Sequence, residues 1–345
     1  VTRATIEAAP SLALIVRAGA GVNTIDMDEA SRRGIAVANC PGRNTAAVAE
    51  LTIGLMIAAD RRIPAATADM AVGRWRKKEY QKARGLLGRT LAVVGLGAIG
   101  RSVAVRAQGL GMNVKAWSRS LTEERAEELE VEYAPTPEAA VAGADAVTVH
   151  LAAGGQTVGF FGRDLFETMR EGAIFINTSR GEIVDTAALR WAIENRSLRV
   201  SLDVYTDEPG GGEADCPDRE LVSMLAAATP HIGASTTQAS EAIAAEVVRI
   251  VRAYAETGKP VNCVNIRARS REDVSLVVRH HNHVGVLAGV LDELRNSGIN
   301  VEEMENTIFT GAATASCTLK LDTAPDRASL ERIQAGEFII QAGLK

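Results

Sequence analysis

The sequence predicts an α/β fold in which a doubly wound parallel sheet is followed by a small α+β module. Apolar strands alternate with helices between about residues 91 and 232, and this alternation is typical of a parallel sheet with right-handed crossovers. A Gly-x-Gly-x-x-Gly turn stands between the first of these strands and its helix. From Ser275 the order becomes strand, helix, strand, strand, helix, strand, which is ferredoxin-like.

Composition narrows the class of protein before any motif is considered. The 345 residues are enough for two or three domains. A net charge of −5 disfavours a nucleic-acid partner, because phosphate binding needs a basic surface. The apolar stretch 51–59 is too short to span a membrane. Four scattered cysteines without metal-ligand spacing indicate reduced thiols, so we expect a cytoplasmic protein.

Short elements open the chain. In order they are a helix at 1–9, a buried strand at 12–17, a helix at 28–34 and a second strand at 35–39. Gly19 and Gly21 lie just beyond the first strand, at the end where α/β sheets bind ligands. A long helical pattern then runs from Ala46 to Arg74 and is interrupted by Pro64.

The parallel sheet comes next and is expected to be of the Rossmann type. Its predicted strands lie at 91–94, 113–117, 146–151, 173–179, 199–204 and 226–232. Residues 209–218 predict a loop, and a helix from about Thr236 to Gly258 leaves the sheet. The C-terminal module is predicted as a strand at 275–281, a helix at 284–298, strands at 299–309 and 312–322, a helix at 327–335 and a strand at 337–344.

The three glycines of the turn each have a physical role in a dinucleotide site. Gly95 permits the tight turn, Gly97 lets the backbone approach a pyrophosphate, and Gly100 lets helix and strand pack closely. The helix N-terminus then offers free N–H groups to the phosphates. A glycine turn needed only for packing is the alternative, and the parallel-sheet pattern on both sides disfavours it.

The second strand of this unit ends in Ser118-Arg119, where such a site usually carries an acid that binds the ribose. Without the acid, the repulsion that excludes a 2′-phosphate is lost, and Arg119 can pair with that phosphate. Alternatively, Arg119 is a surface residue and Ser118 bonds to the ribose of NAD. We expect NAD as the coenzyme, with NADP also accepted.

Three further polar residues are candidates for catalysis. Arg180 follows a buried strand, and its planar guanidinium can hold a carboxylate through two hydrogen bonds. His231 also follows a strand and can act as a general acid or base near neutral pH. A carboxylate from Asp203 or Glu208 would raise the pKa of His231 and orient its ring. Taken singly, each is also compatible with an ordinary structural role.

The remaining histidines carry weaker signals. His150 ends a strand and is expected to be structural or to line a cofactor. His280, His281 and His283 resemble a metal cluster in sequence, but neighbouring strand residues point to opposite faces, and neither a carboxylate nor a thiol completes the set. We therefore expect no metal site.

Five segments together resemble the D-isomer-specific 2-hydroxyacid dehydrogenases. They are NCPGRNTAAVAE (39–50), VVGLGAIGR (93–101), INTSRGEIVD (176–185), LDVYTDEP (202–209) and TPHIGAST (229–236). Their order and spacing match the family from residue 1 to about 265, and the C-terminal module resembles an ACT domain. The resemblance implies an NAD(P)-dependent oxidoreductase acting on the CH–OH group of a 2-hydroxy acid.

The resemblance also assigns roles to residues. Arg180 would bind the substrate carboxylate and polarise the oxo group, His231 would exchange the hydroxyl proton, and Glu208 would keep His231 protonatable. Asp203 would contact the nicotinamide. The implied cofactor-binding residues are Gly95, Gly97, Ala98, Ile99, Gly100, Ser118, Arg119, Thr178, Ser179, Asp203 and Gly233. The implied substrate-binding residues are Arg17, Ala18, Gly19, Ala20 and Arg180.

The domains implied by the resemblance are a partial flavodoxin-like substrate domain at 1–43, completed by about 236–266, an NAD(P)-binding domain at 44–235 and an ACT-like regulatory domain at 272–345. A further strand–helix–strand segment of about fifty residues is expected before residue 1. The ACT signature lacks its proline, but His280, Asn282 and Asn300 remain for a serine site between two modules. His150-Leu151-Ala152 replaces the family's His-Leu-Pro.

Several functions stay open at this level. The substrate is 3-phosphoglycerate, or glyoxylate, hydroxypyruvate or another small 2-oxo acid. The same fold also serves nucleotide-sensing co-repressors, which bind partners with little turnover. We expect a small 2-hydroxy or 2-oxo acid as partner, L-serine as effector, and neither nucleic acid nor membrane. A homodimer or homotetramer is expected, because the apolar helix 46–63 needs cover and ACT modules commonly pair through their sheets.

Overall fold

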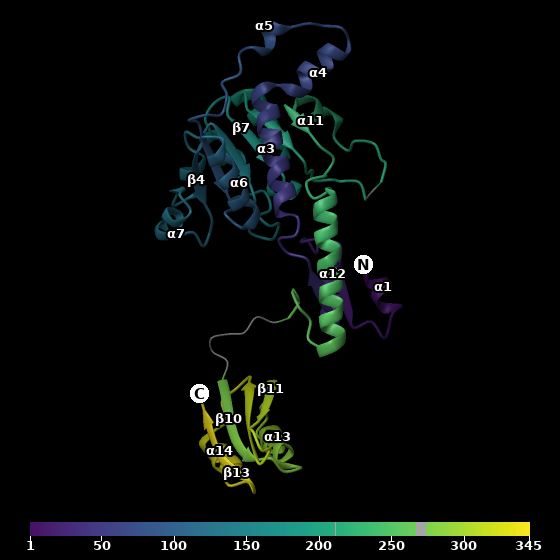
Figure 1. The fold of residues 1–345 in the computed structure, drawn as a ribbon, viewed down its shortest axis with the longest axis vertical. Helices are drawn as coiled ribbons and strands as arrows, with labels where there is room; N and C mark the ends of the chain where they lie inside the picture. Colours follow the sequence, from purple (N-terminus) through teal and green to yellow (C-terminus); the bar gives the residue numbers. More distant parts are fainter. Residues whose placement is uncertain (211, 267–273) are drawn as a thin grey trace. The chain divides into compact units, whose positions relative to one another are not determined.

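A computed structural model describes residues 1–210, 212–266 and 274–345 (Figure 1). The chain forms two compact units, Val1–Asn265 and Ile266–Lys345. No helix within the described ranges is both long enough and apolar enough to cross a membrane. Gly211 of the predicted loop and the predicted start of the C-terminal module at residue 272 lie outside these ranges.

A seven-stranded parallel sheet forms the core of the first unit, with strand order β5-β4-β3-β6-β7-β8-β9. Its strands are β3 (Thr90–Val94), β4 (Asn113–Trp117), β5 (Glu132–Tyr133), β6 (Ala146–Val149), β7 (Ile174–Asn177), β8 (Arg199–Leu202) and β9 (Ala227–Ala228). The order reverses between β3 and β6, so this is the predicted doubly wound sheet and the point where such sheets bind ligands.

Alternating residues of each central strand face two different cores. Leu91 and Val93 of β3 pack with one cluster, whereas Ala92 and Val94 pack with the other. The first cluster lies under α3 (Thr45–Arg61), α6 (Ala98–Gly109) and α7 (Glu123–Glu128). The second lies under α8 (Pro137–Val141), α9 (Arg163–Thr168), α10 (Thr186–Arg196) and α11 (Arg219–Met224). The near-continuous apolar runs of the strands follow from this burial on both faces.

The predicted strands extend beyond the real ones at their carboxyl ends. The strand predicted at 226–232 is only Ala227–Ala228, and β7 ends at Asn177 rather than at Ser179. Pro230 has no N–H to contribute to a ladder, and His231 has a left-handed φ of 52°. The residues that follow each strand turn out of the sheet and form the site.

The helical pattern at 46–74 is divided into two helices, as the sequence predicts. α3 ends at Arg61, Arg62 is left-handed with φ 54°, and α4 (Ile63–Ala71) carries Pro64 in its first turn. Proline is tolerated there because the first turn of a helix has no partner for its N–H. A short α5 (Lys77–Tyr80) follows.

The start of the chain forms a small parallel sheet of β1 (Leu14–Arg17) and β2 (Ala36–Asn39), flanked by α1 (Arg3–Glu7) and α2 (Met27–Arg32). The later helix α12 (Thr237–Thr257) packs here, since its Ile250 is buried with Cys40. Asn265 also accepts a hydrogen bond from the Val37 backbone N–H, 2.8 Å. The division of the first unit at residues 43 and 235 stays a prediction.

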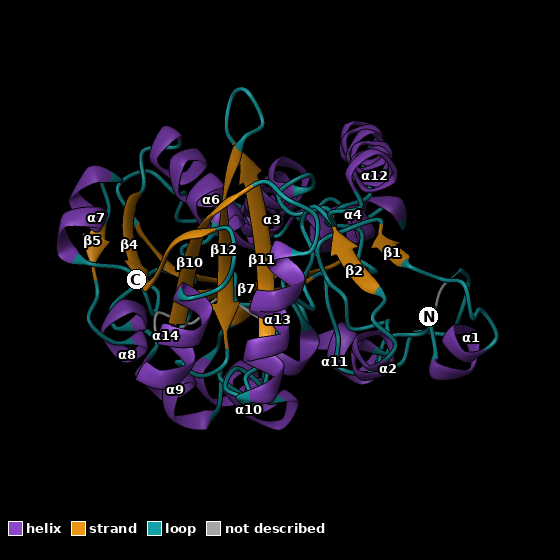
Figure 2. Cartoon of the chain, turned by 90° about the horizontal axis from the view of Figure 1, so that it is seen from below, coloured by secondary structure: helices purple, strands orange, loops and turns teal. Residues whose placement is uncertain are grey.

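The second unit is a four-stranded antiparallel sheet of order β11-β12-β10-β13 with two helices, as predicted (Figure 2). Its elements are β10 (Val274–His281), α13 (Val286–Asn296), β11 (Val301–Ile308), β12 (Thr314–Leu321), α14 (Arg327–Gln334) and β13 (Ile339–Leu344). Alternate residues of β12, such as Cys317 and Leu319, are buried against the helices. This is the ferredoxin-like arrangement.

Candidate active site

Arg180 is held by a tight turn at the carboxyl end of β7. The buried Asn177 donates from Nδ2 to the Arg180 carbonyl, 2.8 Å, and its Oδ1 accepts from the backbone N–H and the hydroxyl of Ser179, 2.9 and 2.8 Å. The Arg180 guanidinium lies against Gly21, where a Cβ would overlap Nη2. Asn177 therefore fixes the turn, and Gly21 makes room for the guanidinium.

The loop after β1 is positioned by the end of β2. Asn39 Nδ2 donates to the Ala20 carbonyl, 2.7 Å, and the Cys40 N–H donates to the Gly19 carbonyl, 2.9 Å. Arg17 folds back and donates to the Ala18 carbonyl, 2.5 Å. Of the predicted substrate-binding residues, Arg17 ends β1 and 18–20 lie on the loop that follows. This loop meets Arg180, the remaining one, through Gly21.

His231 and Glu208 form a direct pair. The imidazole Nδ1 lies 2.5 Å from Glu208 Oε2, and Glu208 Oε1 accepts from the Tyr205 backbone N–H, 2.9 Å. Because a carboxylate only accepts, the proton of the pair lies on Nδ1, and Nε2 is left to exchange a proton with a ligand. The His231 side chain is 43% exposed, so a ligand can reach it.

Asp203 holds the turn that carries His231. Its carboxylate accepts from Thr229 Oγ1, 2.6 Å, and from the backbone N–H groups of Ile232 and Gly233, both 2.9 Å. The His231 N–H donates to the Asp203 carbonyl, 2.8 Å. Burial raises the pKa of Asp203, and these hydrogen bonds oppose the rise. The nicotinamide contact of Asp203 stays a prediction.

The glycine turn after β3 has the geometry of a phosphate-binding loop. Gly95 has a φ of 102°, and a Cβ there would lie 2.5 Å from the His150 carbonyl oxygen. A Cβ on Gly100 would overlap the Gly95 carbonyl. A Cβ on Gly97 would meet nothing within 4 Å, so open space adjoins the start of α6. A pyrophosphate fits this space and the free N–H groups of the helix.

The ends of β3 and β4 supply the remaining predicted cofactor residues. Ala98 and Ile99 form the first turn of α6, and Ser118 and Arg119 directly follow β4. Arg119 is exposed and donates from Nη1 to Gln156 Oε1, 3.3 Å. Gln156 carried no recognisable signal in the sequence, because only the fold brings it to Arg119.

Thr178 and His150 each have polar side-chain atoms shielded from solvent. Thr178 shares a hydrogen bond with Thr52 of α3, 2.8 Å, so its hydroxyl is engaged within the protein. His150 Nε2 lies 3.0 Å from Thr148 Oγ1, whereas its Nδ1 is buried without a partner in the described part of the chain. Burial lowers the pKa of His150 to about 3, so the ring is neutral. An unpaired buried nitrogen beside Gly95 is compatible with a role in lining a cofactor.

The predicted effector residues of the second unit do not meet within one module. His280 is buried, with Nδ1 2.8 Å from the His281 carbonyl oxygen, and Asn282 donates to the Ala312 carbonyl, 3.0 Å. The register pairs His280 with Ala315, whereas Asn300 adjoins the opposite end of β12. A site using all three residues needs a second module.

The histidine-rich segment is not a metal centre within the described residues. His280 Nε2 lies 3.2 Å from Asn306 Oδ1, and His283 stacks on Phe338 with ring centres 4.3 Å apart. Across the described ranges, His, Cys, Asp and Glu side chains nowhere gather in a group of three that could hold a metal ion.

Residues 53–233 match the D-isomer specific 2-hydroxyacid dehydrogenase, NAD binding domain. A D-3-phosphoglycerate dehydrogenase of Archaeoglobus fulgidus is 39% identical over 280 residues, which is 79% of this chain and 51% of that protein. The Bacillus subtilis enzyme of the same name is 35% identical over 82% of this chain and 53% of its own length. The chain thus spans about half the length of these relatives.

Solved structures show the same architecture. A glyoxylate reductase from Paecilomyes thermophila has a TM-score of 0.68 and 31% identity over 76% of this chain and 78% of its own. An NAD⁺-bound 3-phosphoglycerate dehydrogenase from Entamoeba histolytica has a TM-score of 0.64 and 27% identity over 78% of this chain and 80% of its own.

The His150 imidazole, whose Nδ1 is buried, predicts a pH dependence of stability. Its pKa is lowered to about 3 in the folded state against about 6.5 in the unfolded chain, so the unfolded state binds the extra proton between these values. Folding stability should therefore fall as the pH is lowered from 6.5 towards 3. In urea titrations followed by tryptophan fluorescence, His150→Gln should reduce the slope between pH 6 and 4 by up to about 1.4 kcal/mol per pH unit. The exposed His281→Gln is the matched control, and an unchanged slope in His150→Gln would contradict the expectation.

Proposed function

The chain belongs to the D-isomer-specific 2-hydroxyacid dehydrogenases, and we propose that it is an NAD-dependent D-3-phosphoglycerate dehydrogenase, interconverting 3-phosphoglycerate and 3-phosphohydroxypyruvate for L-serine synthesis. The observation that carries the proposal is the His231–Glu208 pair at the edge of the sheet where Arg180 meets the loop after β1. The 34–39% identity to proteins named D-3-phosphoglycerate dehydrogenase supports this substrate.

Each catalytic group has a defined task in this reaction. Arg180 binds the substrate carboxylate and the C2 oxygen, which fixes C2 in the crevice. In oxidation, His231 Nε2 takes the hydroxyl proton while a hydride leaves C2, so the C2 oxygen becomes a carbonyl. The Glu208 carboxylate stabilises the imidazolium that forms. NAD supplies the acceptor for that hydride when it is bound. Reduction runs through the same groups in reverse.

The direct test is the rate of 3-phosphohydroxypyruvate reduction with NADH. His231→Asn should lower kcat by about 10²–10⁴-fold, the usual contribution of a general acid, while NADH binding measured by fluorescence is retained. The matched control is His281→Asn, an exposed histidine of the second unit, which should keep full activity. If His231→Asn retained the wild-type rate, or if wild-type protein showed no turnover yet bound the nucleotide, the co-repressor-like binding function would replace this proposal.

A second guanidinium, at the end of β1, favours the phosphorylated substrate over glyoxylate. Arg17 is the last residue of β1, and its guanidinium lies beside Gly19 of the following loop. A phosphate on C3 needs such a cation, whereas the two-carbon glyoxylate has no group to offer it. Glyoxylate reduction is the alternative activity, supported by the similarity to a glyoxylate reductase.

Substitution of Arg17 tests the substrate. Arg17→Ala should raise KM for 3-phosphohydroxypyruvate by about tenfold or more, because a charged hydrogen bond contributes about 1.5–3 kcal/mol. KM for glyoxylate should stay unchanged, since glyoxylate lacks the phosphate. Both substrates should also be assayed side by side with the wild-type protein. If it reduces glyoxylate but not 3-phosphohydroxypyruvate, the alternative activity is the correct one.

Arg119 also supports a relaxed choice of coenzyme. The family domain binds NAD, and we propose that NADPH is accepted too, because Ser118 removes the acid and Arg119 offers a cation at the surface. We expect kcat/KM with NADPH within about a hundredfold of that with NADH, a gap below about 2.7 kcal/mol. Arg119→Ala should lower the NADPH value by about tenfold and spare NADH. Arg125→Ala, an exposed arginine of α7, is the control. A kcat/KM with NADPH below one hundredth of the kcat/KM with NADH would contradict the proposal that NADPH is accepted.

The assembly and its regulation belong to the same proposal. We infer a cytoplasmic homodimer or homotetramer whose ACT-like second units bind L-serine between them. The separation of Asn300 from His280 supports a site shared by two modules. The exposed Met70 and Trp75, 60% and 78% accessible, support a contact between subunits near α4. The free cysteines fit a reducing compartment.

A further inference from the structure

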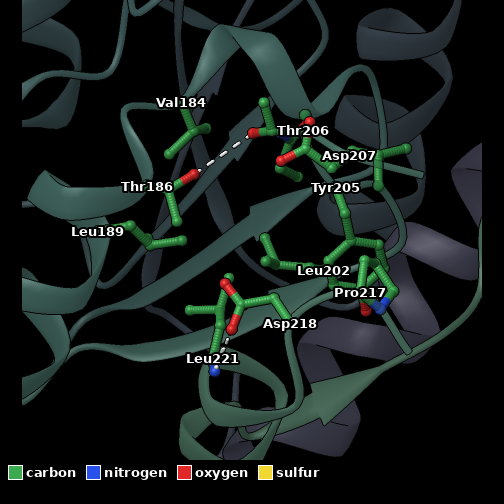
Figure 3. Close-up of a pocket in the computed structure, with 13 residues that line it drawn as sticks. Val184, Thr186, Leu189, Leu202, Tyr205, Thr206, Asp207, Pro217, Asp218 and Leu221 are labelled. Carbon is green, nitrogen blue, oxygen red and sulfur yellow. Dashed lines mark hydrogen bonds between the residues drawn. The ribbon is translucent and has the colours of Figure 1, made fainter. Parts of the chain in front are cut away.

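A partly open hollow lies beside the loop that carries Glu208. Its volume is about 230 Å³, and its walls come from the end of β8, the start of α10 and the start of α11 (Figure 3). The lining residues include Gly181, Thr186, Leu189, Leu202, Tyr205, Thr206, Asp207, Asp218 and Leu221. The two catalytic side chains next to it, Arg180 and Glu208, do not line the hollow.

The two ends of the hollow are polar, and its middle is apolar. Thr186 and Thr206 share a hydrogen bond at one end, 3.3 Å, and Asp218 lies at the other. Leu189 and Leu202 lie between the two ends in Figure 3. A ligand with a short hydrocarbon body and one polar head matches this distribution.

Two carboxylates that line the hollow, Asp207 and Asp218, determine the charge expected of the ligand's polar head. Asp218 is already neutralised, because both its oxygens accept from Arg190 Nη2, 2.6 and 2.8 Å, and Oδ1 also accepts from the Leu221 N–H. These bonds hold the pKa of Asp218 below its usual range, with the Leu221 backbone bond as the largest cause. Asp207 lines the hollow with an exposed side chain, and it makes no hydrogen bond or ion pair within the described chain. The uncompensated charge of the hollow is therefore negative.

We propose that this hollow is a binding site for small alkylammonium ligands, with the ammonium group on Asp207 and the alkyl chain between Leu189 and Leu202. The volume limits the size of the ligand. At about 230 Å³, it is smaller than the roughly 300–1,000 Å³ of sites that hold drug-sized ligands, so only a small ligand fits. A primary amine with a chain of about four carbons fits, whereas an anionic ligand would leave Asp207 facing a like charge.

The hollow is linked to both catalytic residues through the backbone. Gly181, next to Arg180, touches the Tyr205 carbonyl so closely that a Cβ would overlap it. The Tyr205 N–H in turn holds Glu208 Oε1, 2.9 Å. A ligand between these walls would stabilise the contacts by which Tyr205 holds Glu208, and Glu208 holds His231. The site is therefore regulatory as well as a binding site, and this regulatory half rests on the proposed dehydrogenase activity.

Binding is tested with n-butylammonium, n-butanol and butyrate at neutral pH, using calorimetry and amide exchange of the Tyr205 N–H. The ammonium should bind saturably and slow this exchange, butanol should bind about tenfold more weakly, and butyrate should not bind. Asp207→Asn should weaken ammonium binding by about tenfold or more, the range of a charged hydrogen bond. Asp215→Asn removes an equal charge from the same loop without lining the hollow, and it should bind as wild type does. Equal binding by the ammonium and butanol, or by wild type and Asp207→Asn, would overturn the site.

Kinetics test the regulatory half separately. Saturating n-butylammonium should raise kcat/KM for 3-phosphohydroxypyruvate by about fivefold or more, a usual size for coupling between sites. Asp207→Asn should show the same basal rate and no activation. If n-butylammonium binds but does not raise kcat/KM, the regulatory role of the hollow is wrong, whereas the binding site itself stands. A chain without any turnover would overturn the proposed function and leave the binding result to stand on its own.

Discussion

The Asp203 carboxylate is fully buried, yet it accepts three hydrogen bonds from one turn, between Thr229 and Gly233. That turn places His231 in the left-handed region, which costs about 1–3 kcal/mol for a residue with a Cβ. Hydrogen bonds to a charged group contribute about 1.5–3 kcal/mol each, enough to offset the strain. Without this anchor, the imidazole would have no fixed distance to Glu208. The position of the His231–Glu208 pair thus depends on a carboxylate that the resemblance assigns to the cofactor.

The edge of a parallel sheet explains why the functional groups gather in one crevice. Strands β3, β6, β7 and β8 all end there, and each is followed by a loop rather than by a hairpin. The loops touch through glycines, at Gly21 under Arg180 and at Gly181 under Tyr205. A close contact between backbones transmits small shifts because packed atoms cannot interpenetrate. The proposed substrate and coenzyme sites and the hollow beside Glu208 therefore share one connected set of loops.

In the second unit, the buried residues and the histidines make contacts within the unit itself. Its helices cover one face of a four-stranded sheet and bury Cys317, Leu319 and their neighbours. The histidines that suggested a metal cluster serve local purposes: His280 contacts a backbone carbonyl oxygen and Asn306, and His283 stacks on Phe338. The antiparallel register also explains why Asn300 is far from His280 along the sheet.

Much of the fold and the site could be predicted from the sequence, because both are encoded in local patterns. Apolar runs bounded by glycine and proline predict each central strand, and the Gly95, Gly97 and Gly100 spacing predicts the turn that their packing requires. The family resemblance already pointed to Glu208 as the partner of His231, and the structure pairs them. Only the tertiary structure decided that Asp203 holds the turn of His231, that Asn177 locks Arg180, and that β9 is two residues long. The hollow facing Asp207 also became visible only there. Pairings of this kind depend on atoms tens of residues apart, whose approach is set by the packing of helices on the sheet rather than by any periodicity along the chain.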